Sequence, residues 1–190
     1  QKLGYFIDNH DLNRFLNDNS QVANAAPSAG EISNLRTALG WLYTWEGIPV
    51  LYYGTEQNYK QSLALSAGGE MGTGTNRVNM GNRPNLWQVQ NSTQGNTTWN
   101  ENHDTFRWIQ GLNQLRSDYI ELRRGVVTMR WTDDGMGSTG DDGILAYIRK
   151  GATVSVDDDI VVVINTHTSQ NSSPNASVGN DMGTDWPVGT

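Results

Sequence analysis

Two short apolar segments on either side of one helical segment constrain the fold of this chain most. Residues 4–7 read GYFI and residues 49–53 read PVLYY. Continuous apolar runs of this length, bounded by polar residues or glycine, are typical of strands buried on both faces. Between them, apolar side chains recur at steps of three and four: Ile32, Leu35, Leu39, Leu42 and Trp45. This spacing predicts a helix over residues 31–45. The sequence therefore predicts two adjacent parallel strands joined by a right-handed crossover.

Capping signals set the expected ends of the helices. Ser28 and Glu31 have the spacing of a capping box, and Gly47 is expected to end the first helix. We expect Asp104 to be the N-cap of a second helix, which Gly125 ends after Arg123 and Arg124 complement its dipole. One face of this helix is apolar: Phe106, Ile109, Leu112, Leu115, Tyr119 and Leu122.

The pattern changes after Gly125. Residues 126–131, 144–149 and 160–165 read as strands separated by Asp/Gly turns, and no helical period reappears. Residues 1–125 are thus predicted to form α/β units and residues 126–190 an antiparallel β domain.

Composition excludes several classes of function. The chain carries 13 basic and 20 acidic residues, a net charge of −7, so we expect no nucleic-acid partner. It has no cysteine, which excludes disulfides, a thiolate zinc site and a cysteine nucleophile. No apolar run approaches the ~18 residues of a membrane helix, so we expect no membrane span. The chain begins at Gln1 without a basic leader, and we expect it to be a piece of something longer.

Polar side chains follow both predicted strands. Residues 8–11 read Asp-Asn-His-Asp directly after the first strand, and Glu56 and Gln57 follow the second. The carboxyl end of a buried parallel strand is where α/β barrels keep their catalytic groups. Two alternatives stay open at this point: Asp8 and Asp11 cap a turn, and Glu56 is structural.

Together these segments resemble a known family. FIDNHD, followed about forty residues later by GIPVLYYGTEQ, is similar to segments on the seventh and eighth barrel strands of the α-amylase superfamily of retaining glycosidases and transglycosidases. LNQLRSDYIELRRG resembles the family's last barrel helix, which an antiparallel β domain follows. The resemblance covers residues 3 to about 165. It implies an α/β fold: the last two β/α units of a (β/α)8 barrel and an incomplete antiparallel β domain.

The resemblance assigns roles to three residues of the first segment. It implies that Asp11 is the family's transition-state-stabilising aspartate, which is neither nucleophile nor proton donor. It implies that Asp11 contacts the hydroxyl groups of the sugar that is cleaved, and that His10 binds this same sugar. Arg14 aligns with an arginine that binds chloride in some members; a structural salt bridge is the better expectation, and we expect no chloride.

The remaining candidates are less specific. Trp87 and Trp99 lie in a long stretch rich in Gly, Asn, Ser and Thr, from about residue 54 to 103, where they either stack on pyranose rings or pack the loop. His103 and Asp104 repeat the letters of the motif, but their position favours helix capping. Residues 157–159 are three aspartates without the spacing of a calcium loop, so we expect a solvated turn. Calcium in the parent enzyme is implied by resemblance alone, and the chain shows no ligands for it.

A retaining glycosidase needs a nucleophile and an acid/base, which the family carries on barrel strands upstream of this sequence. We therefore expect a fragment of an α-amylase-type glycosidase that hydrolyses α-1,4-glucan, inactive by itself and completed by the missing N-terminal part. The alternatives are a cyclodextrin glucanotransferase or related transglycosidase, and a non-catalytic carbohydrate-binding or assembly module. The resemblance also implies a secreted or periplasmic protein.

Overall fold

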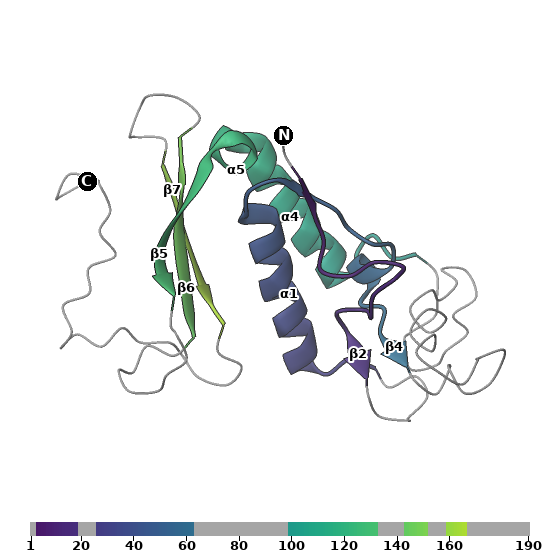
Figure 1. Cartoon of the computed structure of the whole chain (residues 1–190). Helices are drawn as coiled ribbons and strands as arrows, with labels where there is room; N and C mark the ends of the chain where they lie inside the picture. The colour runs from purple at the N-terminus through teal and green to yellow at the C-terminus, as the bar shows by residue number, and fades with distance from the viewer. Residues whose placement is uncertain (1–2, 19–25, 63–98, 133–142, 152–158, 167–190) are drawn as a thin grey trace, which may run out of the picture. The chain divides into compact units, whose positions relative to one another are not determined.

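The computed structural model describes residues 3–18, 26–62, 99–132, 143–151 and 159–166 (Figure 1). The elements in chain order are β1 (Gly4–Tyr5), β2 (Asn17–Asp18), α1 (Ala29–Thr44), β3 (Ile48–Pro49), the 3-10 helix η1 (Thr55–Gln57), β4 (Gln61–Ser62), α4 (Asp104–Asp118), α5 (Ile120–Arg124), β5 (Val126–Thr132), β6 (Ile144–Lys150) and β7 (Ile160–Asn165). They form a mixed α/β structure with parallel strand pairs and one antiparallel sheet.

The predicted strand–helix–strand unit is present. β1 pairs with β3, and α1 connects them. Ile48 N donates to Leu3 O at 3.0 Å and Val50 N donates to Tyr5 O at 2.8 Å. The two strands therefore run in the same direction, as in a parallel pair. A second parallel pair, β2 with β4, was not predicted because each of its strands has only two residues.

The expectation that the first two strands are buried on both faces is wrong for these residues. Phe6, Ile48 and Val50 are 45%, 56% and 47% exposed, while the intervening Tyr5 and Pro49 are partly buried. Successive side chains of a strand point to opposite faces. One face of this pair is therefore covered, and no described residue covers the other. The hydrogen-bonded strands are also shorter than the apolar runs, at two residues each.

The predicted capping box opens α1. Ser28 N donates to Glu31 Oε2 at 2.7 Å, and Glu31 N donates to Ser28 Oγ at 3.2 Å. This reciprocal pair satisfies two backbone N–H groups at the helix start. Lys60 Nζ lies 2.8 Å from the other carboxylate oxygen of Glu31. The helix ends at Thr44, and Gly47 adopts the left-handed φ of 103° in the turn before β3.

By its internal contacts the chain divides into two units. Unit 1 comprises residues 1–3, 43–48 and 113–190, and unit 2 comprises residues 4–42 and 49–112. The predicted domain boundary at residue 125 stays a prediction. Each unit has its own buried side chains. Those of unit 2 are Leu16, Leu35, Leu39, Leu42, Tyr59, Ile109 and Leu112, and those of unit 1 are Tyr43, Leu122, Ala146, Tyr147 and Ile148.

In unit 2, α1 and α4 lie side by side (Figure 1). The indole N–H of Trp108 donates to the carbonyl oxygen of Arg36 at 3.2 Å. Arg36 Nη2 also lies 3.6 Å from Asp104 Oδ2, at the start of α4.

The second predicted helix is broken. Tyr119 has φ −110° and ψ 109°, an extended conformation that separates α4 from α5. Arg123 Nη1 donates to the carbonyl oxygens of Arg116 and Ser117 at 2.7 and 2.6 Å, so it satisfies the end of α4. Leu115, inside α4, and Tyr119, at the break, are 44% and 48% exposed, so neither continues the buried face.

The three strands predicted after Gly125 form one antiparallel sheet in the order β5–β6–β7. The register pairs Val126 with Lys150 and Arg149 with Ile160, and an irregularity between Met129 and Trp131 interrupts the β5 ladder. β6 is the central strand, and its residues 146–149 are buried. Among the described helices, none is both long and apolar enough to cross a membrane.

Candidate functional site

The first motif forms a loop between β1 and β2. Asp8, directly after β1, is 2% exposed. Its carboxylate accepts from Thr55 Oγ1 at 3.2 Å on both oxygens, and from Phe15 N at 3.3 Å on Oδ2. The two ends of residues 8–15 are thus held together, and both are held to the segment after β3.

Arg14 lies at the same base and is also 2% exposed. Its Nη1 donates to Tyr53 O at 2.6 Å and to Thr55 Oγ1 at 3.4 Å. The guanidinium carbon lies 4.3 Å from the ring centroid of Tyr52 and 5.0 Å from that of Tyr53, within the range of cation–π contact. These contacts are of the kind expected for a structural arginine.

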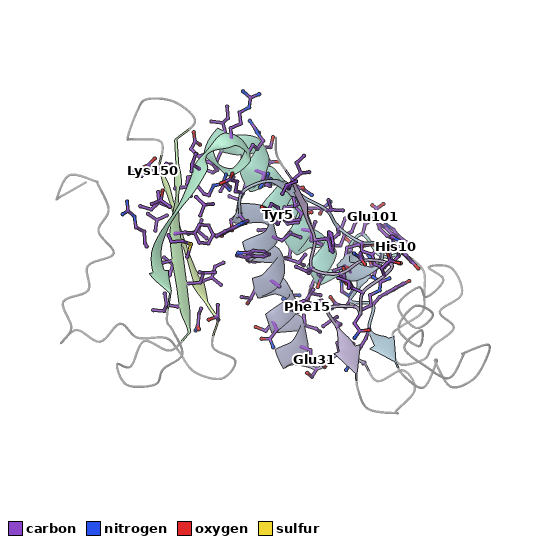
Figure 2. The ribbon with its side chains drawn as sticks, viewed as in Figure 1. Tyr5, His10, Phe15, Glu31, Glu101 and Lys150 are labelled. Carbon is purple, nitrogen blue, oxygen red and sulfur yellow. The ribbon has the colours of Figure 1, made fainter. Side chains whose placement is uncertain are left out.

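His10 and Asp11 lie at the exposed end of the loop. Their side chains are 62% and 66% exposed, and His10 Nε2 lies 3.1 Å from Asp11 Oδ2. Figure 2 shows His10 at the outside of the ribbon. Asn9 Oδ1 accepts from the backbone N–H groups of Asp11 and Leu12 at 2.7 and 2.8 Å. The side chain that caps this turn is therefore Asn9, which leaves the carboxylate of Asp11 directed to solvent.

Burial controls the electrostatics of the loop base. It raises the pKa of Asp8 above its usual value, although the N–H of Phe15, the charge of Arg14 and the hydroxyl of Thr55 act in the opposite direction. Burial likewise lowers the pKa of Arg14, with the Asp8 carboxylate opposing it. Two carboxylates, Asp8 and Glu56, thus lie near one guanidinium in a site that excludes most water.

Glu56 does not project into solvent after the second strand. It is 5% exposed, its Oε1 accepts from Gly54 N at 3.1 Å, and its Oε2 has no hydrogen-bond partner among the described residues. Burial raises the pKa of Glu56, and the charge of Arg14 lowers it to a smaller extent. The structural alternative for Glu56 is therefore favoured over the catalytic one.

Trp99 is described by the structure, and Trp87 lies outside the described residues. Trp99 is 41% exposed and contacts Phe106 edge to face, with ring centroids 5.5 Å apart. The neighbouring Asn100 is held by Gln57: its N–H donates to Gln57 Oε1 and its carbonyl accepts from Gln57 Nε2, both at 3.2 Å. Part of the ring packs against Phe106 and part is accessible, and sugar stacking by Trp99 stays a prediction.

The expectation that Asp104 caps α4 is wrong. His103 is the N-cap: its Nδ1 accepts from Thr105 N at 3.2 Å and its carbonyl accepts from Arg107 N at 3.0 Å. Burial lowers the pKa of His103, because the neutral imidazole is favoured there. Asp104 is the first helical residue, where a carboxylate complements the helix dipole.

No three His, Asp or Glu side chains gather into a group that could hold a metal ion within the described ranges. Of the three aspartates at 157–159, only Asp159 is described. Its Oδ1 accepts from Gly151 N at 2.8 Å, as a turn residue does. Calcium thus stays a prediction by resemblance.

Comparisons with known proteins agree on one family. No protein-family profile matches the chain. The Beta/alpha-amylase of Paenibacillus polymyxa is 35% identical over 152 residues, which are 76% of this chain and 10% of that protein. The cyclomaltodextrin glucanotransferase of Geobacillus stearothermophilus is 28% identical over 168 residues, which are 88% of this chain and 17% of that protein. The chain therefore spans between a tenth and a fifth of these relatives.

Solved structures give the same result. The γ-cyclodextrin glucanotransferase of an alkalophilic Bacillus clarkii superposes with a TM-score of 0.52 at 25% identity, over 88% of this chain and 18% of that one. A variant of AmyP in complex with maltotriose superposes with a TM-score of 0.56 at 18% identity, over 87% of this chain and 31% of that one, which is a likeness of fold. By sequence and by structure, this chain is a relative of the α-amylase family, glycoside hydrolase family 13.

Proposed function

We propose that these 190 residues are part of an α-amylase-type retaining glycosidase that cleaves α-1,4-glucan. In this proposal residues 1–125 supply the last two β/α units of a (β/α)8 barrel, and residues 126–190 supply part of the β domain that follows. The observation that carries the proposal is the solvent-directed pair His10–Asp11 on a loop with a buried, hydrogen-bonded base. The similarity to an amylase and to glucanotransferases supports it.

Asp11 is the proposed transition-state stabiliser. The positive charge that develops on the sugar ring strengthens hydrogen bonds from sugar hydroxyls to a carboxylate, so such contacts act mainly in the transition state. His10 lies within hydrogen-bond distance of Asp11 and is equally exposed, so both can meet the hydroxyls of one sugar. The nucleophile and acid/base, which stand ~5 Å apart in retaining enzymes, are not assigned to residues of this chain.

Transfer to a sugar acceptor is the second candidate reaction. Glucanotransferases are among the relatives by sequence and by structure, which favours this alternative. A hydrolase and a transferase share the first chemical step and differ in the acceptor of the glycosyl group. Analysis of the products separates them, because the transferase forms cyclic or elongated glucans and the hydrolase forms shorter linear ones.

Asp11→Asn in the full-length protein tests the proposal. The amide keeps the shape and loses the charge, so kcat on starch should fall about 10³-fold or more, since several kcal/mol of transition-state stabilisation are lost. KM should change much less. His10→Asn should raise KM together with a milder loss of kcat, because His10 holds the sugar before and during reaction. Asp104→Asn, at a similar His-Asp pair, should leave both constants unchanged.

Turnover by Asp11→Asn close to that of the wild type contradicts the proposal. A non-catalytic module predicts a different result: the full-length protein then shows no turnover, while it still binds maltotriose. The 190-residue chain alone should release no reducing sugar from starch, and starch hydrolysis by the pure chain would contradict its assignment as a part of the catalytic unit.

A further inference from the structure

The loop that carries His10 and Asp11 begins and ends at one buried point. Asp8 precedes the loop and Phe15 follows it, and the N–H of Phe15 donates to Asp8 Oδ2 at 3.3 Å. This hydrogen bond joins positions seven residues apart. The loop between them is therefore closed at its base.

Thr55, from the second motif, connects both sides of this base. Its hydroxyl oxygen lies 3.2 Å from each oxygen of Asp8 and 3.4 Å from Arg14 Nη1. A hydroxyl donates one proton and accepts through its lone pairs. Thr55 thus donates to the carboxylate while it accepts from the guanidinium, and one orientation of the hydroxyl serves both. All three residues are 2% exposed.

The main chain connects the buried base of the loop to Asp11. Asn9 follows Asp8 directly, and its side chain accepts from the N–H groups of Asp11 and Leu12. The side chain of Asp11 is 66% exposed, so packing does little to fix it. The turn that starts at Asp8 fixes the main chain of Asp11, and the side chain extends from that main chain to His10 Nε2, 3.1 Å from Asp11 Oδ2.

We propose that Thr55 is a positioning residue for Asp11, and that its hydroxyl holds the base formed by Asp8 and Arg14 so that the Asp11 carboxylate is preorganised. The kinetic part of this inference rests on the proposed function of Asp11. A displacement of a catalytic group by about 1 Å lowers the rate on the order of a hundredfold. Loss of a hydroxyl that does not touch the substrate can therefore lower kcat if it shifts Asp11. Thr55 itself does not reach the sugar, because it is buried beneath the loop.

Three variants test the proposal. Thr55→Val removes the hydroxyl and keeps the shape, and Thr55→Ser keeps the hydroxyl. Thr44→Val is the matched control, because Thr44 Oγ1 forms a 2.6 Å hydrogen bond with Tyr147 Oη, and both residues belong to unit 1, whereas the loop belongs to unit 2. The first measurement is amide hydrogen exchange of Asp11 and Leu12 in the 190-residue chain. We expect exchange about tenfold faster or more in Thr55→Val, and wild-type exchange in Thr55→Ser and Thr44→Val.

The second measurement is the kinetics of the full-length protein on starch. Thr55→Val should lower kcat about ten- to a hundredfold with KM close to the wild-type value. Thr55→Ser should restore kcat to within about twofold of the wild type, since the hydroxyl returns. Thr44→Val should lose thermal stability and keep kcat and KM at the wild-type values. If destabilisation in general lowered activity, Thr44→Val would lower kcat as well.

The outcomes separate this inference from the proposed function. Unchanged exchange at Asp11 and Leu12 in Thr55→Val overturns the positioning role, whatever the kinetics. Faster exchange in Thr55→Val, together with full turnover by Asp11→Asn, supports the positioning of the loop and contradicts the proposed role of Asp11. If Thr55→Val does not fold, Thr55→Ala, which also removes the hydroxyl and places no γ-methyl group against Asp8 and Arg14, replaces it with the same expected increase in exchange, and unchanged exchange then overturns the proposal.

Discussion

Arg149 Nη1 donates to the carbonyl oxygen of Thr44 at 2.7 Å, and Arg149 Nη2 donates to that of Gly125 at the same distance. α1 has no basic residue in its own last turn. Arg149 from β6 takes that role, together with Arg116, which donates to the carbonyls of Tyr43 and Gly47 at 2.6 and 2.9 Å. A cation at a helix C-terminus is favourable because it meets the negative end of the dipole and the unpaired carbonyls.

Arg149→Met should therefore destabilise the chain. The side chain is 0% exposed, so its loss leaves buried carbonyl oxygens without donors, at about 2–4 kcal/mol in total. Urea unfolding of the 190-residue chain measures this difference. Arg124→Met, at an exposed position, is the control and should stay within about 0.5 kcal/mol of the wild type. Equal stability of Arg149→Met and the wild type would show that these hydrogen bonds contribute nothing net.

Gly125 and Gly111 should respond in opposite ways to alanine. A Cβ at Gly125 would overlap the carbonyl oxygen of Lys150 and lie 2.6 Å from that of Glu121, so Gly125→Ala forces backbone to move. A Cβ at Gly111, inside α4, meets nothing within 4 Å. Gly111→Ala should raise stability by about 0.5–1 kcal/mol through helix propensity. Thermal unfolding measures both, and a destabilised Gly111→Ala or a neutral Gly125→Ala would contradict this description of the two sites.

His103 makes the capping of α4 sensitive to pH. Its pKa is lowered in the folded chain by burial, so its contribution is fully present above the unfolded value of about 6.5. The contribution is lost as the pH falls from there through the lowered pKa, because the unfolded chain binds the proton more readily. His103→Asn caps without titrating and should remove this part of the pH dependence. Unfolding free energies at several pH values test it; an unchanged profile in the variant argues against the cap.

The contribution of Glu56 to stability should change with pH in the direction opposite to that of His103. Burial raises its pKa above 4.5, so its contribution to stability is fully present below that value and is lost as the pH rises through the raised pKa. Glu56→Gln abolishes the loss, and the variant should gain stability relative to the wild type over this window.

Glu31→Gln provides the control for Glu56→Gln. Although burial opposes it, the hydrogen bonds from Lys60 and Ser28 lower the pKa of Glu31. Its contribution is therefore present above 4.5 and lost as the pH falls through the lowered pKa. For each variant, urea unfolding measures the difference in unfolding free energy from the wild type at several pH values. We expect this difference to favour Glu56→Gln as the pH rises and to favour Glu31→Gln as the pH falls. Differences that change with pH in the same direction would refute the assignment.

Local patterns predicted most elements of the fold, because they depend on neighbours in the sequence. The capping box at Ser28 and the antiparallel strands after Gly125 are of this kind. The choice between His103 and Asp104 as cap was wrong because residue preference favours aspartate there, whereas the chain geometry presents the imidazole. The break at Tyr119 has no local signal, since the apolar period continues through it.

The base of the candidate site was beyond prediction for another reason. The sequence pointed to His10, Asp11 and a structural Arg14, but the hydrogen bonds of Thr55 to Asp8 and Arg14 join positions 47 and 41 residues apart. Here these contacts form because β1 and β3 pair, which brings the segments that follow the two strands together. Asn9 was missed as the capping residue, although an Asn before a His-Asp pair is a signal for a side-chain-capped turn.

The hydrogen bond between Asp8 and Thr55 also determines how this chain can be recombined with its relatives. A chimera with a crossover between residues 16 and 52 takes Asp8 and Arg14 from one parent and residue 55 from the other. Residues that share one hydrogen-bonded network have non-additive effects, so neither parent's behaviour predicts that of the hybrid. The two segments are inherited as one unit, and exchanges placed before residue 8 or after residue 59 keep that unit intact.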